Sequence, residues 1–381
     1  MKNKLYVLIC LSLSLMFIFS FFNSSKITYA LPEIVSSAKT MVLIEQNSKR
    51  VLLEKYKDTQ LPMASTTKIM TALSVLKRCE NLDVEIKVDK RAVGIEGTSM
   101  YLQKDEVVSL KDLLYGMLLA SGNDAACALA LHISASIDDF ALIMNADAKE
   151  IGALNSNFTN PHGLDEQGHF TTAFDLALIC SQAMKYPFFK QAISMKSAIV
   201  KGAGGKHGDT RLLVNKNKLL GHYEHCTGGK IGFTDNAGRC LVSTATKGNL
   251  NLICVVLNCP DMFLDSIKIL DFGINNYRQT ELLEQYQVHR KIIVEEGKES
   301  EVKVYTKRSF CYPLTLDETM EIGFEYELPN TIKAPIEKEQ VVGTYKILLN
   351  DEIIFEENLY SLEDIKSITF GENFKEIVHN W

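Results

Sequence analysis

The chain has 381 residues, of which 46% are hydrophobic and 23% are charged, and its formal net charge is −6. That is enough apolar material for a large globular core, and the length favours two domains over one. The acidic balance, without a long basic run in the sequence, excludes a class of protein that works mainly by binding nucleic acid.

The first 30 residues have the pattern of an export signal. Lysines precede the apolar run 5–22, and Thr28 and Ala30 supply small side chains at the −3 and −1 positions of a cleavage site. An uncleaved membrane anchor is the alternative, because the run approaches the length of about 20 residues that a membrane span needs. We expect residues 1–30 to be a signal peptide and the mature chain to lie outside the cytoplasm.

The nine cysteines favour buried thiols over a metal site. Cys10 leaves with the signal peptide, and most of the other eight lie in apolar segments, where a cysteine packs as a small hydrophobic residue. The sequence contains no Cys-x-x-Cys spacing, so it does not predict a structural zinc site. A chain of this length does not need disulfides in order to fold.

The periodicity then predicts secondary structure in chain order. A hairpin is expected over 39–56, helices over 65–78, 109–120, 124–134, 138–152 and 262–277, and buried strands over 238–246 and 250–259. This order predicts an α/β sandwich with an antiparallel sheet over 31–280. From 286 to 362 the pattern changes to short alternating strands, which predicts a separate small all-β domain. Residues 363–381 form a short amphipathic segment.

Ser65 and Lys68 open one of these predicted helices. Residues three apart share a helix face, so the Ser65 Oγ and the Lys68 Nζ can meet. Apolar residues follow Lys68 at once, and a lysine among such neighbours loses hydration, which favours its neutral amine. A neutral amine beside a hydroxyl is a base next to a nucleophile. A helix cap followed by a lysine that reaches solvent explains the segment equally well.

Two later segments place polar residues where apolar elements meet. Ser121 and Asn123 lie between two apolar helices, where polar groups must satisfy the helix ends, although a plain helix–helix turn would need the same residues. Lys230 opens a predicted strand and Gly232 follows it, and a glycine inside a strand lets another backbone approach closely. A strand that begins with a solvated lysine is the alternative here.

In this order the Ser-x-x-Lys, Ser-x-Asn and Lys-x-Gly triplets resemble the penicillin-binding serine acyltransferases. The finer match is to the low-molecular-weight D-alanyl-D-alanine carboxypeptidases, and it is carried by PMASTTKIMTAL (62–73), MLLASGNDAA (117–126), TNPHGLDEQGHFTTAFDLAL (159–178) and IKAPIEKEQVVG (332–343). The resemblance covers nearly the whole mature chain. It implies a serine β-lactamase/transpeptidase-like α/β sandwich with an antiparallel sheet, plus a small C-terminal all-β domain.

The resemblance also implies a reaction and its residues. Ser65 would attack the carbonyl between the two terminal D-alanines of a peptidoglycan stem peptide, and Lys68 would take its proton. Ser121 would relay a proton to the leaving amine, and Asn123 would bind the substrate amide. Hydrolysis of the acyl-enzyme by water would complete a carboxypeptidase reaction that needs no metal or cofactor, and β-lactam antibiotics would inhibit it.

A second group of residues would bind the substrate. Lys230 would lie near the terminal carboxylate and help to keep Lys68 neutral, because two close ammonium groups disfavour each other's charge. Gly232 and Thr234 belong to the same strand. The backbone N–H groups of Ser65 and Phe233 would form an oxyanion hole, whose donors contribute roughly 3–4 kcal/mol each in comparable enzymes.

Ile231 departs from the family pattern, which has threonine or serine between the lysine and the glycine. The lost hydrogen bond to the substrate carboxylate would cost about 1.5–3 kcal/mol of recognition, and Thr234 or an arginine elsewhere would have to compensate. A peptidoglycan-binding homologue without activity, disabled at Ile231, is therefore one alternative. A β-lactamase is another, although Glu150, Glu166 and Glu224 all lack the asparagine four residues on that the common serine type uses. A zinc peptidase fits less well, because the histidines lack a His-Glu-x-x-His spacing.

The C-terminal segment 363–381 has two possible contacts, a membrane or the chain's own β domain. Phe370, Phe374, Ile377 and Trp381 fall on one helical face, as in a helix that contacts a membrane peripherally. The segment is short and not basic, so docking against its own β domain is the alternative. With an export signal, the resemblance implies a location in the cell wall or on the outer face of the cytoplasmic membrane.

Overall fold

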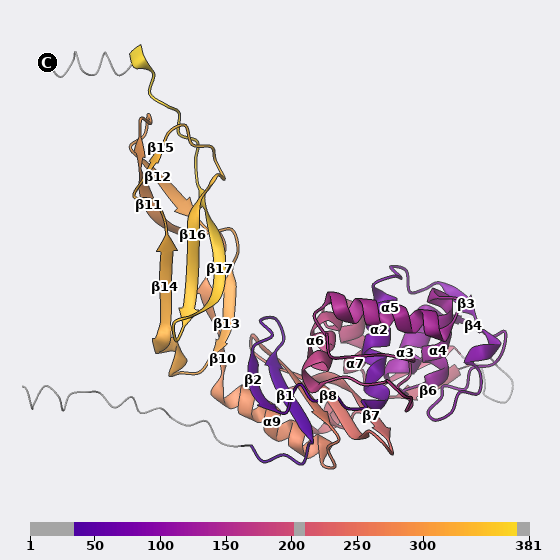
Figure 1. Ribbon diagram of the computed structural model, residues 1–381. Helices are drawn as coiled ribbons and strands as arrows, with labels where there is room; N and C mark the ends of the chain where they lie inside the picture. Colours follow the sequence, from indigo (N-terminus) through magenta and orange to yellow (C-terminus); the bar gives the residue numbers. More distant parts are fainter. Residues whose placement is uncertain (1–33, 202–209, 372–381) are drawn as a thin grey trace, which may run out of the picture. The chain divides into compact units, whose positions relative to one another are not determined.

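The structure, a computed structural model, describes residues 34–201 and 210–371 (Figure 1). The predicted signal peptide and most of the predicted C-terminal helix lie outside these residues. Within them no single helix is long and apolar enough to cross a membrane, although the pair α4 (Asn123–Ile133) and α5 (Ile137–Glu150), bent by 85°, passes the same criteria of length and composition.

A five-stranded antiparallel sheet in the order β2-β1-β9-β8-β7 forms the centre of the first domain. Its strands are β1 (Thr40–Glu45), β2 (Val51–Lys55), β7 (Cys226–Thr234), β8 (Gly238–Lys247) and β9 (Leu250–Leu257). The predicted hairpin and the two predicted buried strands are thereby confirmed. β7 is an edge strand, so one side of its backbone is left outside the sheet ladder.

The sheet is apolar on both faces, as β9 illustrates. Ile253 and Val255 join the cluster under most of the helices, whereas Cys254 and Val256 join a second cluster under α9 (Met262–Asn276). Successive side chains of a strand point to opposite faces, so a strand covered on both sides must be apolar throughout. This explains why 250–257 reads as an unbroken apolar run.

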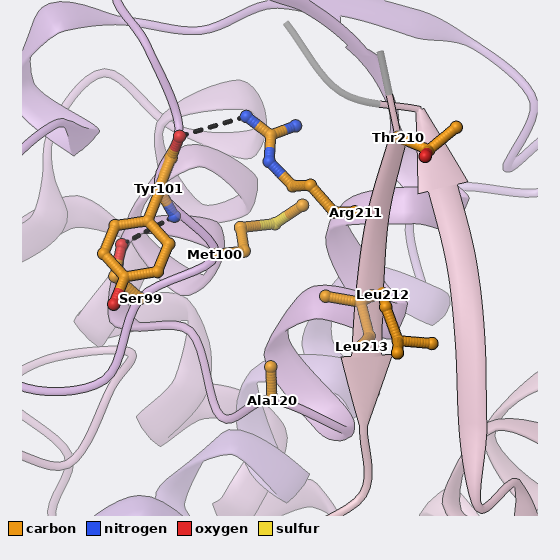
Figure 2. Close-up of a pocket in the computed structure, with 8 residues that line it drawn as sticks. All are labelled: Ser99, Met100, Tyr101, Ala120, Thr210, Arg211, Leu212 and Leu213. Atoms are coloured by element: carbon orange, nitrogen blue, oxygen red, sulfur yellow. Dashed lines mark hydrogen bonds between the residues drawn. The ribbon is translucent and has the colours of Figure 1, made fainter. Parts of the chain in front are cut away.

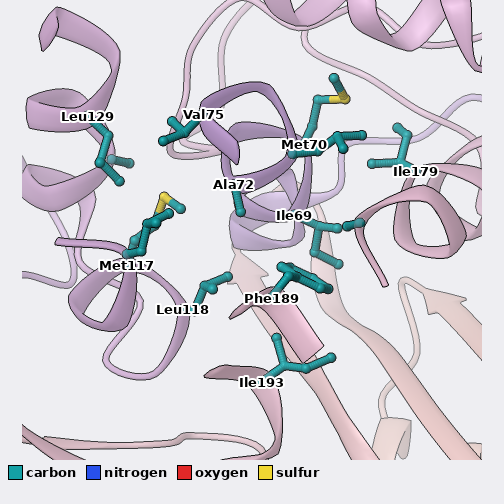
Figure 3. Packing of buried hydrophobic residues seen from close by; sticks show 14 of the residues in the cluster. Ile69, Met70, Ala72, Val75, Met117, Leu118, Leu129, Ile179, Phe189 and Ile193 are labelled. Atoms are coloured by element: carbon teal, nitrogen blue, oxygen red, sulfur yellow. The ribbon is translucent and has the colours of Figure 1, made fainter. Parts of the chain in front are cut away.

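The other long helices cover the opposite face from α9 (Figure 1). They are α2 (Lys68–Leu76), α3 (Leu110–Leu118), α4, α5, α6 (Ala173–Ala183) and α7 (Pro187–Ser194). All of α2 is buried, and it packs among Met117, Leu129 and Phe189 (Figure 3). A helix buried on every side is apolar all round. This burial takes its first residue, Lys68, out of water.

Shorter elements surround this core. They are the 3₁₀ turns η1 (Ala64–Thr67) and η2 (Lys90–Ala92), the strand pairs β3 (Glu85–Lys87) with β4 (Val107–Ser109) and β5 (Ser197–Lys201) with β6 (Thr210–Val214), and helix α8 (Leu219–His222). The helix predicted over 65–78 therefore begins as the η1 turn and becomes α-helical only at Lys68. Ser65 therefore lies on a tight turn immediately before the first residue of α2.

The C-terminal residues form an all-β domain, as predicted. A six-stranded sheet has the order β14-β16-β17-β12-β11-β15, and β10 pairs with β13. These strands are β10 (Arg278–Leu283), β11 (Val288–Glu295), β12 (Glu301–Tyr305), β13 (Phe310–Leu314), β14 (Ile322–Glu327), β15 (Thr331–Lys333), β16 (Val341–Leu349) and β17 (Glu352–Ser361), and the 3₁₀ turn η4 (Glu318–Glu321) precedes β14. The domain has its own apolar cluster, which includes Val302, Ile347 and Leu359.

Candidate active site

Ser65 lies in the η1 turn. The hydroxyl groups of the two threonines that follow Ser65 stabilise this turn. The Thr66 and Thr67 hydroxyls donate to the carbonyl oxygens of Met63 and Ala64 at 2.6 and 2.9 Å. Ala64 has a φ of +49°, which is uncommon for a residue with a side chain and is a form of strain found at functional sites. The turn therefore holds Ser65 in a conformation that the surrounding contacts impose.

The Lys68 amine is fully buried and has three polar contacts. Its Nζ lies 2.8 Å from the Ser65 Oγ, 2.7 Å from the Asn123 Oδ1 and 2.6 Å from the His162 carbonyl oxygen. Burial lowers the pKa of Lys68 well below its ordinary value, and the nearby Lys230 lowers it further. Both effects favour the neutral form of the amine, which can act as a base.

The contacts also orient the lone pair of that neutral amine. A neutral amine has two N–H groups and one lone pair. The His162 carbonyl can only accept, and the Asn123 oxygen is assigned as an acceptor because the amide nitrogen donates to the Glu96 carbonyl at 2.5 Å. Both N–H groups are therefore committed. The lone pair is left for the Ser65 hydroxyl.

Ser121 sits on the turn between α3 and α4 with a φ of +65°. A loop that runs from Glu96 to Leu102 fastens this turn: the Asn123 N–H donates to the Thr98 carbonyl at 2.7 Å, and the Thr98 hydroxyl donates to the Ser121 carbonyl. Asp124 anchors the same loop.

Asp124 is a buried carboxylate that accepts four hydrogen bonds. Its donors are the Ser99 hydroxyl and the backbone N–H groups of Met100, Leu102 and Ala125, at 2.6 to 3.0 Å. Four donors compensate for the desolvation of the charge. Sequence reasoning gave Asp124 no role, although it belongs to the quoted SGND segment.

Lys230 comes from β7 and reaches the same turn from the other side. Its Nζ donates to the Ser121 Oγ at 2.9 Å and to the Ile231 carbonyl at 3.0 Å. Burial lowers the pKa of Lys230 to about 7, and the positive charge of Lys216 contributes. The charge of Lys216 also lowers the pKa of Lys68. Sequence reasoning missed Lys216, since no motif marks it.

The backbone of β7 runs directly against the Ser65 turn. A Cβ added to Gly232 would lie 2.9 Å from the Ser65 nitrogen and 2.9 Å from the Met63 carbonyl oxygen, so a side chain would push the strand away. Phe233, the next residue, has a largely exposed ring. The close approach brings the two predicted oxyanion-hole residues to one edge of the sheet.

Thr234 ties the end of β7 to the loop that covers Lys68. Its hydroxyl donates to the Asp165 Oδ1 at 2.9 Å and accepts the Ala237 N–H at 3.0 Å. The hydroxyl proton is therefore already used, and a role for Thr234 in carboxylate binding stays a prediction. Ile231 packs against the apolar cluster on the α9 side, so an ethyl group in place of the threonine hydroxyl leaves β7 in register.

The loop 159–171 covers Lys68, whose Nζ donates to the His162 carbonyl oxygen of this loop. Gly163 has a φ of +87°, and a Cβ there would lie 2.0 Å from the Ala64 carbonyl oxygen, so only glycine fits. The His169 Nδ1 accepts the Thr159 N–H at 3.1 Å, which leaves the Nε2–H to donate to the Thr67 hydroxyl at 2.8 Å. The loop and the Ser65 turn are thus bonded through a neutral histidine.

The buried neutral His169 predicts that the free energy of unfolding decreases in acid. Burial lowers the pKa of His169 from 6.5 to about 4, so the unfolded chain binds a proton between these values that the folded chain excludes. Stability is then lost as the pH falls from 6.5 towards 4, by about 2 kcal/mol for this residue at pH 4.5. We expect His169→Gln to lose less unfolding free energy between pH 7 and pH 4.5 than the unsubstituted protein in urea titrations. Equal losses would contradict the assignment.

Both lysines reach the turn between α3 and α4. The Lys68 amine contacts Asn123 of this turn and also Ser65, and the Lys230 amine donates to Ser121, two residues before Asn123. The arrangement offers a hydroxyl nucleophile, an amine beside it that can act as a base, a second hydroxyl bonded to a second amine, and an edge-strand backbone. These are the parts that acyl transfer requires.

Comparisons with known proteins identify relatives along nearly the whole chain. The family profile described as D-alanyl-D-alanine carboxypeptidase matches residues 26–261, and that of the penicillin-binding protein 5 C-terminal domain matches residues 277–367. The D-alanyl-D-alanine carboxypeptidase DacF of Bacillus subtilis is 31% identical over 92% of this chain and 91% of its own length. DacC of Escherichia coli is 31% identical over 90% of this chain and 89% of its own.

Solved structures agree with the sequence relatives. Penicillin-binding protein 5 from Haemophilus influenzae superposes with a TM-score of 0.76 at 29% identity, and the match covers 89% of this chain and 100% of that one. The predicted fold, an α/β sandwich with an antiparallel sheet and a C-terminal all-β domain, is confirmed.

Proposed function

The chain belongs to the D-alanyl-D-alanine carboxypeptidase family and is a serine-type carboxypeptidase, and on this premise we propose that Ser65 cleaves the terminal D-alanine from peptidoglycan stem peptides through an acyl-enzyme. The contact that carries the proposal is the 2.8 Å approach of the Lys68 Nζ to the Ser65 Oγ. Both other contacts of that nitrogen are acceptors, so its lone pair faces the hydroxyl.

Acylation begins as the Ser65 Oγ attacks the carbonyl carbon of the penultimate D-alanine. Lys68 takes the hydroxyl proton, and the N–H groups of Ser65 and Phe233 receive the oxyanion. The C–N bond then breaks, and Ser121 relays to the amine of the leaving D-alanine the proton that Lys68 took, so that Lys68 is neutral again and Ser121 keeps its hydroxyl. Lys230 donates to the Ser121 Oγ during this relay. Asn123 binds the substrate amide beside the base.

Deacylation returns the enzyme to its starting state. Water attacks the Ser65 ester, and a base takes one of its protons while the Ser65 Oγ regains a proton as it leaves. Lys68 is suited to both transfers, because its Nζ lies 2.8 Å from the Ser65 Oγ and burial lowers its pKa well below the ordinary value of a lysine. The shortened peptide and free D-alanine are the products. A penicillin would acylate the same serine by opening its lactam ring.

Two lysines are suited to the substrate's terminal carboxylate. Lys230 lies on the strand edge, and Lys216 lies close enough to shift the pKa of both Lys230 and Lys68. A bound carboxylate would offset the mutual repulsion of these ammonium groups. Such a cation pair would compensate for the hydroxyl that Ile231 lacks.

Release of D-alanine from a synthetic peptide ending in D-Ala-D-Ala tests the proposal. We expect the purified protein to release one D-alanine per peptide, measured with a D-amino-acid oxidase assay, and to leave the same peptide ending in L-alanine intact. A folded protein that binds peptidoglycan without releasing D-alanine would instead support the inactive homologue. We also propose that the protein acts outside the cytoplasm, at the cell wall or the outer face of the cytoplasmic membrane.

Ile231→Thr tests the role of the atypical strand residue. β7 is an edge strand, so a threonine hydroxyl at 231 lies within reach of a ligand bound along that edge. A hydrogen bond to a charged group contributes about 1.5–3 kcal/mol, so we expect kcat/KM for D-Ala-D-Ala peptides to rise about 10-fold or more. An unchanged kcat/KM would show that the side chain at 231 serves only the apolar cluster and that the lysines recognise the carboxylate alone.

A further inference from the structure

Two loops give backbone carbonyl groups to residues of the candidate site, and they are anchored in different ways. The 96–102 loop is bonded to a charged side chain, because Arg211 of β6 donates to the Tyr101 carbonyl at 3.0 Å beside a pocket (Figure 2). The 159–171 loop is bonded to α2 through a neutral group, the hydroxyl of Thr71. A substitution that removes no charge can therefore test this second attachment.

Thr71 lies three residues after Lys68 on the same face of α2, and it is fully buried. A threonine inside a helix commonly donates to the carbonyl four residues before it, but this hydroxyl donates to the Pro161 carbonyl of the loop at 2.6 Å. The next carbonyl, that of His162, accepts from the Lys68 Nζ, also at 2.6 Å. Two successive carbonyls of the loop are therefore bonded to one face of one helix.

The side chain of Asn160 stiffens the turn that carries these two carbonyls. Its Oδ1 accepts the backbone N–H groups of His162 and Gly163 at 3.3 and 2.7 Å, and its Nδ2 donates to the Glu166 carboxylate at 3.0 Å. Asn160 is itself buried, and the ring of Pro161 fixes the φ angle of the next residue. A displacement of the Pro161 carbonyl would therefore also displace the carbonyl of His162.

We infer that Thr71 is a positioning residue for the base. Its hydroxyl fixes the loop so that the His162 carbonyl accepts one N–H of the Lys68 amine, which leaves the lone pair facing Ser65. Without the Thr71 bond the carbonyl is free to shift, and the amine can turn the released N–H towards the Ser65 Oγ. An amine in that orientation cannot take the hydroxyl proton. This inference rests on the proposed function.

Thr71→Val tests the inference on the full protein, because valine has the shape of threonine but lacks the hydroxyl. Acylation by benzylpenicillin, followed by stopped flow at several concentrations, gives a limiting rate constant and a half-saturating concentration. A misplacement of about 1 Å can cost about 100-fold in rate, so we expect the limiting rate constant to fall about 10-fold to 100-fold. The half-saturating concentration should stay within about 2-fold, because only the transition state uses the base. Thr71→Ser, which keeps the hydroxyl, should restore most of the rate.

A double-mutant cycle separates positioning of the base from a general structural effect. Lys68→Gln has no proton acceptor to position, so adding Thr71→Val to it should slow acylation by less than about 2-fold. Ser181→Ala is the matched control, since Ser181 is buried on α6 and its hydroxyl donates to the Gln46 carbonyl at 2.8 Å. This control removes a comparable bond from a different loop, and we expect the limiting rate constant to remain unchanged.

Three results would overturn the inference and leave the proposed function standing. They are a folded Thr71→Val protein whose limiting rate constant is unchanged, a Thr71→Ser protein that is as slow as Thr71→Val, and equal slowing by Thr71→Val with and without Lys68→Gln. If valine prevents folding, Thr71→Ala removes the same hydroxyl and is judged by the same three results. If the unsubstituted protein neither reacts with penicillin nor releases D-alanine, the proposed function fails and the inference falls with it.

Discussion

Ser65→Ala is expected to remove both the acyl-enzyme and the peptidase activity. Loss of the nucleophile in serine hydrolases lowers kcat by about a million-fold, so D-alanine release should fall by more than about 1000-fold, to the limit of the assay. The variant should also fail to form a covalent adduct with a fluorescent penicillin. Because the Ser65 Oγ bonds only the Lys68 amine among the described contacts, its loss should leave the fold intact.

The matched control is Ser194→Ala. Ser194 is an exposed serine at the end of α7, and its hydroxyl donates to the Gln191 carbonyl. We expect this variant to keep full labelling and full turnover. A Ser65→Ala protein that is folded by circular dichroism and still forms a penicillin adduct would show that another residue is the nucleophile.

Lys68→Gln is expected to have the second largest effect. Glutamine can still donate to the His162 carbonyl, but it cannot take a proton. General-base catalysis contributes about 100-fold to 10,000-fold, so the rate of Ser65 acylation by penicillin should fall within that range. Removing a buried amine also removes its desolvation cost, so the free energy of unfolding should not decrease. Stopped-flow acylation and urea unfolding measure the two quantities.

The dependence of the acylation rate on pH tests the role of Lys68 as the base. Burial lowers the pKa of Lys68, so the amine is neutral above that value and becomes protonated as the pH falls through it. The acylation rate of the unsubstituted protein should therefore rise with pH and then level off, and Lys68→Gln should lose this rise. Lys77→Gln is the control: Lys77 caps the same helix, but Asp147 and Glu150 pair with it and raise its pKa. A Lys68→Gln protein that keeps the pH-dependent rise would contradict the role of Lys68.

Local patterns predicted the main helices and strands and the proximity of Ser65 to Lys68, for physical reasons. The partial burial of β2 and the continuous apolar runs of β1 and β9 each follow from how many faces of the strand are buried. The contact between Ser65 and Lys68 could be predicted, because residues three positions apart at the start of a helix lie on the same face. The start of α2 could not, since the η1 turn before it packs closely against Gly163, which is distant in sequence.

The residues that sequence reasoning missed all act through tertiary contacts. Asp124 collects donors from a loop more than 20 residues away, and Lys216 acts through charge on two lysines of other elements. Arg211 pairs with Glu106 across 105 positions of the chain. Nothing in a local window distinguishes these side chains from solvated charges. They become visible only once β5, β6 and the 96–102 loop are brought together.

The most direct test of the account is to identify the atom that becomes acylated. The purified protein would be incubated with benzylpenicillin, digested under mildly acidic conditions and analysed by tandem mass spectrometry. The account predicts a penicilloyl ester on Ser65, in the peptide that also carries Lys68, and no adduct on Ser121 or any other residue. An adduct on a different side chain, or a folded protein that acquires none, would contradict it.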